Sequence, residues 1–125
     1  MLPGDVDIFL RKHIDSIEGL ELMLMLQQSS ETDFGQEDCA ERLGISTSTA
    51  KRQLELLTTG GLLTHSAAGY RFAPKTDELR KQVQRLIEVY GERRIDVVNT
   101  IIGRSLDRIR EFADAFRLRK EKKDG

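Results

Sequence analysis

A group of side chains in the middle of the chain can hydrogen-bond to phosphates or to the edges of nucleic-acid bases. A lysine can neutralise a phosphate, an arginine can read a guanine, and hydroxyl groups can bond to either. The candidates are Thr47, Ser48, Lys51 and Arg52, with Thr49 and Gln53 beside them, and Arg71 further along the chain. Most of them fall on the first turns of one expected helix.

That helix has clear signals at its beginning and its end. Ser46 can cap it, because a serine hydroxyl accepts from a backbone N–H of the first turn. Gly60-Gly61 ends it. Its inner stripe is expected to be Ala50, Leu54 and Leu57. The polar candidates then point away from the core.

A second short helix, residues 36–43, precedes the turn that leads into Ser46. Its inward positions are expected to be Cys39, Ala40 and Leu43, and the small Ala40 lets the two helix axes approach closely. Gly44 supplies the positive φ that a tight turn requires, and Ile45 acts as a buried apolar plug. The turn should fix the angle between the two helices.

The flanking segments complete a small module. A strand, a turn that ends in glycine and a second strand are predicted over residues 62–73, and Pro74 closes the hairpin. Upstream, residues 6–14 form either a short helix or an extended arm, and a helix begins after Ser16. The polar loop that follows this helix returns to the core at Phe34.

The order of these elements resembles a known family. The run from Gln36 to Ser46, with the apolar stripe and Gly61-Leu62 that follow, is similar to the winged helix-turn-helix of bacterial transcriptional regulators over roughly residues 16–74. The resemblance implies a mainly α fold with a small β-hairpin wing, in which residues 1–74 form the winged helix-turn-helix domain and residues 75–125 form C-terminal helices. It also implies that the Ser46 helix enters the major groove of double-stranded DNA, with Thr47, Ser48, Lys51, Arg52 and Arg71 as the DNA-binding residues.

The C-terminal part carries two apolar stripes at helical spacing. We expect the first helix to bend or end at Gly91, a further helical patch over residues 95–102, and a break at Gly103-Arg104-Ser105 before the last helix. Either the stripes pack back on their own module, or they form a homodimer interface that suits two-fold symmetric DNA sites. The candidate dimerisation residues are Leu79, Val83, Leu86, Tyr90, Ile109, Phe112 and Phe116. The basic end after Phe116 is either a frayed terminus or a contact for phosphate or an acidic partner.

The charge distribution weighs against strong binding to nucleic acid. The net charge is −1, with six basic against eleven acidic residues in 1–74 and fourteen against ten in 75–125. Phosphate contacts supply most non-specific affinity, and only Lys51, Arg52 and Arg71 bring positive charge to the expected face, so binding per subunit should be weak. The alternative is therefore a winged-helix adaptor that binds another protein and not DNA.

Other function classes lack their usual residues. A single cysteine, Cys39, excludes an internal disulfide and a multi-cysteine metal site, and its inward position indicates a buried structural thiol. The sequence contains no glycine-rich phosphate loop, nucleophile elbow or His-Glu-x-x-His pair. We expect a cytoplasmic, non-enzymatic protein without a cofactor and without membrane insertion.

Overall fold

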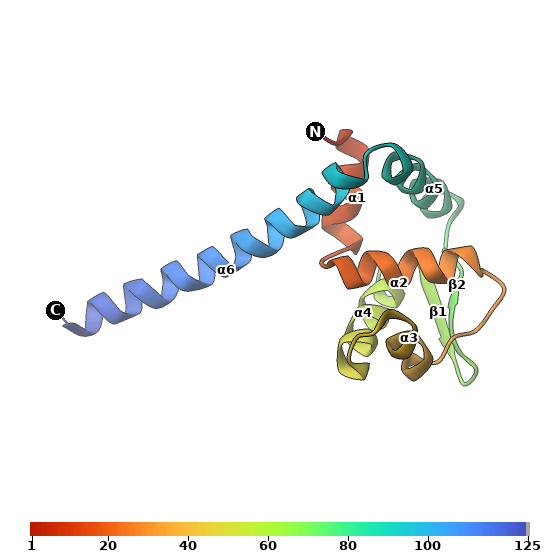
Figure 1. Ribbon diagram of the computed structural model, residues 1–125, viewed down its shortest axis with the longest axis horizontal. Coiled ribbons are helices and arrows are strands. Elements are labelled where there is room, and N and C mark those ends of the chain that lie inside the picture. Colours follow the sequence, from red (N-terminus) through yellow and green to blue (C-terminus); the bar gives the residue numbers. More distant parts are fainter. Residues whose placement is uncertain (125) are drawn as a thin grey trace.

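One helix, α2, separates two groups of elements in the computed structural model of the protein (Figure 1). The structure describes the backbone of residues 1–124 and the side chains of residues 1–115. Helices α3 and α4 and the hairpin lie on one side of α2, and α1 and α5 lie on the other (Figure 1). The last helix, α6, begins beside α1 and then leads away from the rest of the molecule (Figure 1).

The described elements follow one another in the order that the sequence predicts, with the exception of the tail. They are α1 (Gly4–His13), α2 (Ile17–Gln28), α3 (Gln36–Leu43), α4 (Thr47–Thr59), β1 (Leu63–Ser66), β2 (Gly69–Phe72), α5 (Asp77–Glu92) and α6 (Arg94–Asp124). The protein is therefore mainly helical with one small antiparallel hairpin. The segment around residues 6–14, for which the sequence allows either a short helix or an extended arm, forms a helix.

The first apolar helix, α2, is held at its start and in its middle by specific contacts. The Ser16 hydroxyl accepts a hydrogen bond from the Gly19 amide at 3.0 Å, as expected of an N-cap. Gly19 lies close to α4, and a Cβ there would lie 2.7 Å from Oε1 of Gln53, so a larger residue would require that side chain to move. Leu20, Leu22 and other apolar side chains of α2 are buried between the two groups of elements.

The hairpin is completed by a short extended segment from the loop before α3. Leu63 pairs with Phe72 and Ser66 with Gly69 in an antiparallel register. Phe34 adds a bridge to Tyr70, with both backbone N–H···O bonds at 2.8 Å. Phe34 is also 5% exposed, so it anchors the loop in the core as predicted.

The apolar stripe of α5 belongs to the core of its own chain, which corrects part of the predicted dimer interface. Val83 is 1% exposed and Leu86 is 0% exposed, and α5 packs against α1. Leu79 and Tyr90 are half-buried against the same core. Of the two arrangements that the sequence leaves open, α5 adopts the one in which the stripe packs back on its own module.

The expected break at Gly103-Arg104-Ser105 is wrong, because one helix, α6, runs through these residues. The bend or end expected at Gly91 coincides with the end of α5 at Glu92. Ser105 does not cap a new helix, and its hydroxyl instead donates to the carbonyl of Ile101, one turn earlier, at 3.4 Å. A glycine inside a helix costs only about 1 kcal/mol relative to alanine, which the burial of Val97 and Ile101 in the core can offset.

The first turns of α6 join the same core as α1 and α2. Val97 is 0% exposed and Ile101 is 1% exposed, and both belong to one cluster with residues of the first helices. The predicted boundary at residue 74 therefore does not separate two cores. Among the residues that the structure describes, no helix combines the length and hydrophobicity needed to cross a bilayer.

Candidate nucleic-acid interface

Helix α4 presents a polar face to solvent and buries the opposite face. The inner stripe that the sequence predicts is confirmed, since Ala50, Leu54 and Leu57 are each 0% exposed. The Ser46 hydroxyl caps the helix by accepting from the Thr49 amide at 3.1 Å. The four α4 candidates for DNA contact are all exposed: Thr47, Ser48, Lys51 and Arg52.

The turn between α3 and α4 has the geometry that the residue types require. Gly44 has a φ of 67°, in the left-handed region that favours glycine. The amide of Ile45 donates to the carbonyl of Ala40 at 3.0 Å, and Ala40 is 4% exposed where the two helices meet. Ile45 packs against the core as an apolar plug, although it is half-buried where the sequence predicts a buried residue.

Two side chains named beside the candidates do not share their exposure. Gln53 is 3% exposed and packs against Gly19 of α2, so it cannot reach a ligand outside the molecule. Thr49 is half-buried, and its hydroxyl accepts from Ser46 at 2.8 Å. Helical spacing of 3.6 residues turns both away from the face that carries Ser48 and Lys51.

Arg52 is held by an acidic residue from another part of the chain. Its Nη2 lies 3.3 Å from Oδ2 of Asp15, which precedes the N-cap of α2. The Arg52 side chain is still 73% exposed, so the pair lies at the surface and contributes at most about 1 kcal/mol to stability. The guanidinium can therefore exchange this carboxylate for another acceptor.

Arg71 is bound more fully, by Asp33 in the loop before α3. Its Nε and Nη2 donate to the two carboxylate oxygens at 3.1 and 2.8 Å. This fork-to-fork geometry fixes the guanidinium plane as well as its position. Within the described residues, Lys51 is thus the one basic candidate of the three that has no ion pair.

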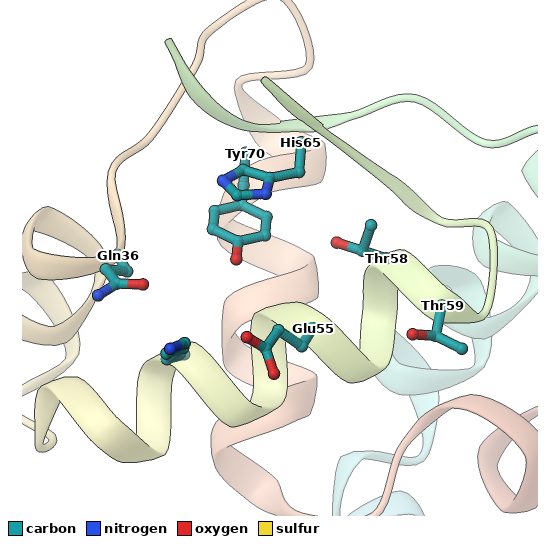
Figure 2. A pocket seen from close by; sticks show the side chains of 7 residues that line it. Gln36, Glu55, Thr58, Thr59, His65 and Tyr70 are labelled. Atoms are coloured by element: carbon teal, nitrogen blue, oxygen red, sulfur yellow. The ribbon is translucent and has the colours of Figure 1, made fainter. Parts of the chain in front are cut away.

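A hollow of about 590 Å³ lies between α4, the start of α3 and the hairpin (Figure 2). Its lining residues are Gln36, Lys51, Glu55, Thr58, Thr59, His65 and Tyr70. The His65 ring stacks on the Tyr70 ring, with centroids 4.0 Å apart and planes 5° from parallel. Figure 2 shows the Tyr70 hydroxyl pointing away from the hairpin, toward Glu55 on α4.

Sequence analysis did not single out Gln36, Glu55 or Tyr70 as site residues. Glu55 follows Lys51 by four residues, so the helical period alone indicates that the two share a face. No comparable local signal connects Gln36 with Tyr70, because their proximity depends on the bridge between Phe34 and Tyr70. Burial raises the pKa of Tyr70, and the nearby Glu55 carboxylate raises it further, so its hydroxyl keeps its proton and remains a donor.

Cys39 lies inside the module, on the inner side of α3. It is 0% exposed, and burial, followed by the neighbouring Asp38, raises the pKa of its thiol to about 11. A protonated, enclosed thiol is a poor nucleophile and a poor metal ligand. The prediction of a buried structural thiol is confirmed.

The apolar residues of α6 beyond its first turns are exposed. Ile109 is 63% exposed and Phe112 is 75% exposed, with Ile102 and Leu106 also uncovered on the same helix. Phe116 and the basic end after it lie outside the residues whose side chains the structure describes. The tail candidates therefore divide into buried members on α5 and exposed members on α6.

Comparison with models of known protein families finds no match to the chain, and no curated protein is significantly similar to it.

Proposed function

We propose that the protein is a DNA-binding transcriptional regulator that acts as a homodimer through a winged helix-turn-helix. In this proposal α3 and α4 form the helix-turn-helix and the β1–β2 hairpin is the wing. The observation that carries it is the exposed outer face of α4, where Thr47, Ser48 and Lys51 are open to solvent. Among the described residues, α6 borders this helix at Arg52, where Ser105 and Arg108 line a shared hollow, and its ribbon then leads away from the module (Figure 1). A helix held at a fixed angle with such a face fits the major groove.

The electrostatics favour binding through specific contacts over general attraction to the phosphate backbone. Arg52 and Arg71 are already paired with Asp15 and Asp33, so they neutralise DNA phosphate only after exchanging partners. Among the described residues, Lys51 and the Thr47 hydroxyl remain available without such an exchange, whereas the Ser48 hydroxyl shares a hydrogen bond with Ser46 at 3.2 Å. Affinity for arbitrary DNA is therefore expected to be low at physiological salt.

The exposed residues of α6 support the homodimer. Ile102, Leu106, Ile109 and Phe112 recur at intervals of three and four residues along the projecting helix. A two-fold symmetric contact covers the same stripe on both copies at once, and it presents two α4 helices to two half-sites of the DNA. Two modules together also compensate for the weak binding of each.

The experiment that tests this function is selection from a random duplex pool at low salt, followed by measurement of binding at low and moderate salt. We expect enrichment of a two-fold symmetric sequence, which is bound more tightly than random duplex. An absence of binding to any duplex at low salt would contradict the proposal.

A second candidate is an adaptor that uses the same module to bind another protein. The two ion pairs favour it, because they reduce the positive charge on the face that would meet DNA. The acidic balance of residues 1–74, six basic against eleven acidic, points the same way. This candidate predicts no duplex binding at low salt, which separates it from the first.

A further inference from the structure

Tyr70 carries a hydroxyl that the protein itself leaves without a partner. The residue is 4% exposed, yet among the described residues its hydroxyl makes no hydrogen bond, and it points into the hollow between the hairpin and α4 (Figure 2). The ring is enclosed, while the hydroxyl itself opens into the hollow, where it can donate to an incoming group. An aimed, unused donor in a hollow of this kind indicates a ligand.

The start of α3 adds donors at the same place. Its N-cap is Gly35, which offers no side chain to accept from the first-turn amides, and the first residue, Gln36, lines the hollow. Uncapped amides at a helix start attract anions. This turn also carries two carboxylates, of which Asp38 is paired with Arg42 at 3.0 Å and Glu37 is exposed to solvent.

The backbone holds these donors together. The two bonds between Phe34 and Tyr70, both 2.8 Å, fix the start of α3 beside the strand that carries Tyr70. Lys51 brings a positive charge from α4 to the same hollow. Three separate elements thus bring side chains with donors to one space, and Glu55 bounds that space on the α4 side.

We propose that this hollow seats one phosphodiester of the DNA backbone, with Tyr70 as a phosphate-binding residue beside Lys51 and Gln36. The proposal rests on the DNA-binding function above and assigns a contact within it. Glu55 favours a singly charged phosphodiester over a free phosphate dianion, because each added negative charge is repelled by its carboxylate. This phosphate contact fixes the position of the protein along the duplex and does not recognise a base.

The test is Tyr70→Phe in the full-length protein, which removes the hydroxyl and leaves the ring that stacks on His65. Tyr90→Phe is the matched control, since Tyr90 is the other tyrosine and lies on α5. We expect Tyr70→Phe to weaken duplex binding about tenfold for every sequence, because a hydrogen bond to a charged group is lost. The salt dependence and the melting temperature should not change, and Tyr90→Phe should bind as the unaltered protein does.

Duplexes with a single neutral methylphosphonate locate the contact. At one linkage per half-site the neutral substitution should weaken Tyr70→Phe less than it weakens the unaltered protein, because only Lys51 and Gln36 still meet the charged phosphate in the variant. Inorganic phosphate, added at constant ionic strength, should not compete. The proposed phosphate site is wrong if the unaltered protein binds DNA and Tyr70→Phe binds equally well, or if no linkage shows this coupling. The DNA-binding function would still stand in either case. Competition by inorganic phosphate would overturn the preference for a phosphodiester. If the unaltered protein binds no duplex, the function itself fails.

Discussion

Arg71 on β2 donates two hydrogen bonds, at 3.1 and 2.8 Å, to the two carboxylate oxygens of Asp33 in the loop before α3. The pair joins the hairpin to the segment that leads into α3, next to the bridge between Phe34 and Tyr70. It positions the proposed wing and at the same time occupies the guanidinium that would meet DNA. The same contact thus supports the fold and limits the charge of the proposed interface.

Asp33→Asn should therefore strengthen binding to duplex DNA. The substitution removes a competing carboxylate, so we expect affinity to rise about three- to fivefold, since surface ion pairs contribute up to about 1 kcal/mol. The slope of log affinity against log salt concentration should also steepen by nearly one released counterion, because Arg71 becomes free to bind phosphate. Equilibrium titrations at several salt concentrations measure both effects.

Arg71→Ala supplies the control for this prediction. If Asp33 acts through Arg71, Asp33→Asn should have no effect on DNA binding in an Arg71→Ala background. An equal gain in both backgrounds would show that the carboxylate acts by general repulsion and not through Arg71.

The two apolar stripes of the tail should respond differently to substitution. Phe112 is 75% exposed, so Phe112→Asp should leave the free energy of unfolding of the protomer within about 0.5 kcal/mol. In the proposed homodimer it should shift the solution mass from dimer to monomer. Leu86 is 0% exposed, so Leu86→Ala should lower the free energy of unfolding by about 2–5 kcal/mol. Light scattering and urea titration separate these outcomes, and a mass of one protomer for the unaltered protein would exclude the dimer.

His13 should make the stability of the protein depend on pH. It is 3% exposed, lies against Gly60 and Phe9, and burial, then the neighbouring Lys12, lowers its pKa below the usual 6.5. The folded protein therefore binds fewer protons at this site than the unfolded chain does. The free energy of unfolding should be highest above about pH 6.5 and should fall as the pH drops from there toward the lower folded-state pKa.

Urea titrations across this pH range test the role of His13. His13→Leu should flatten the dependence between pH 6.5 and the region where carboxylates begin to titrate, near pH 5. His65→Ala should keep the dependence, because His65 lies exposed on β1. A dependence that survives His13→Leu would assign it to another group.

Gly103 offers a test of the continuous tail helix. A Cβ at this position would meet no atom within 4 Å, and the residue lies inside α6. Gly103→Ala should therefore raise helicity and stabilise α6 by about 0.5–1 kcal/mol. Circular dichroism before and after the substitution measures the change, and a loss of helicity would mean that the chain needs a glycine to turn there.

Local signals were enough to predict α3, the turn and α4. Ser46 needs only the next three residues to act as a cap, and Gly44 needs only its own backbone to adopt positive φ. The same kind of signal predicted the hairpin. These features depend on neighbours in sequence, which a single sequence displays directly.

The features that sequence reasoning missed depend on distant partners or on small energies. The ion pairs of Arg52 and Arg71 join residues 37 and 38 positions apart, and no spacing rule indicates them. An apolar stripe indicates that another surface must cover it, but it does not identify that surface. Val83 was therefore predicted to contact a second copy, whereas it packs in the core of its own chain. The false break at Gly103 came from a glycine whose cost of about 1 kcal/mol is too small to end a helix that Val97 and Ile101 anchor in the core.

The central claim is that the outer face of α4 binds duplex DNA, and Ser48→Glu tests it most directly. Ser48 lies in the first turn of α4, where a carboxylate is favoured by the helix dipole, so the fold should be retained or slightly stabilised. Gln82→Glu on the exposed side of α5 is the matched change in charge. Fluorescence anisotropy with a selected duplex at low salt should show that Ser48→Glu loses binding while Gln82→Glu keeps it. Equal binding by both variants would contradict the claim.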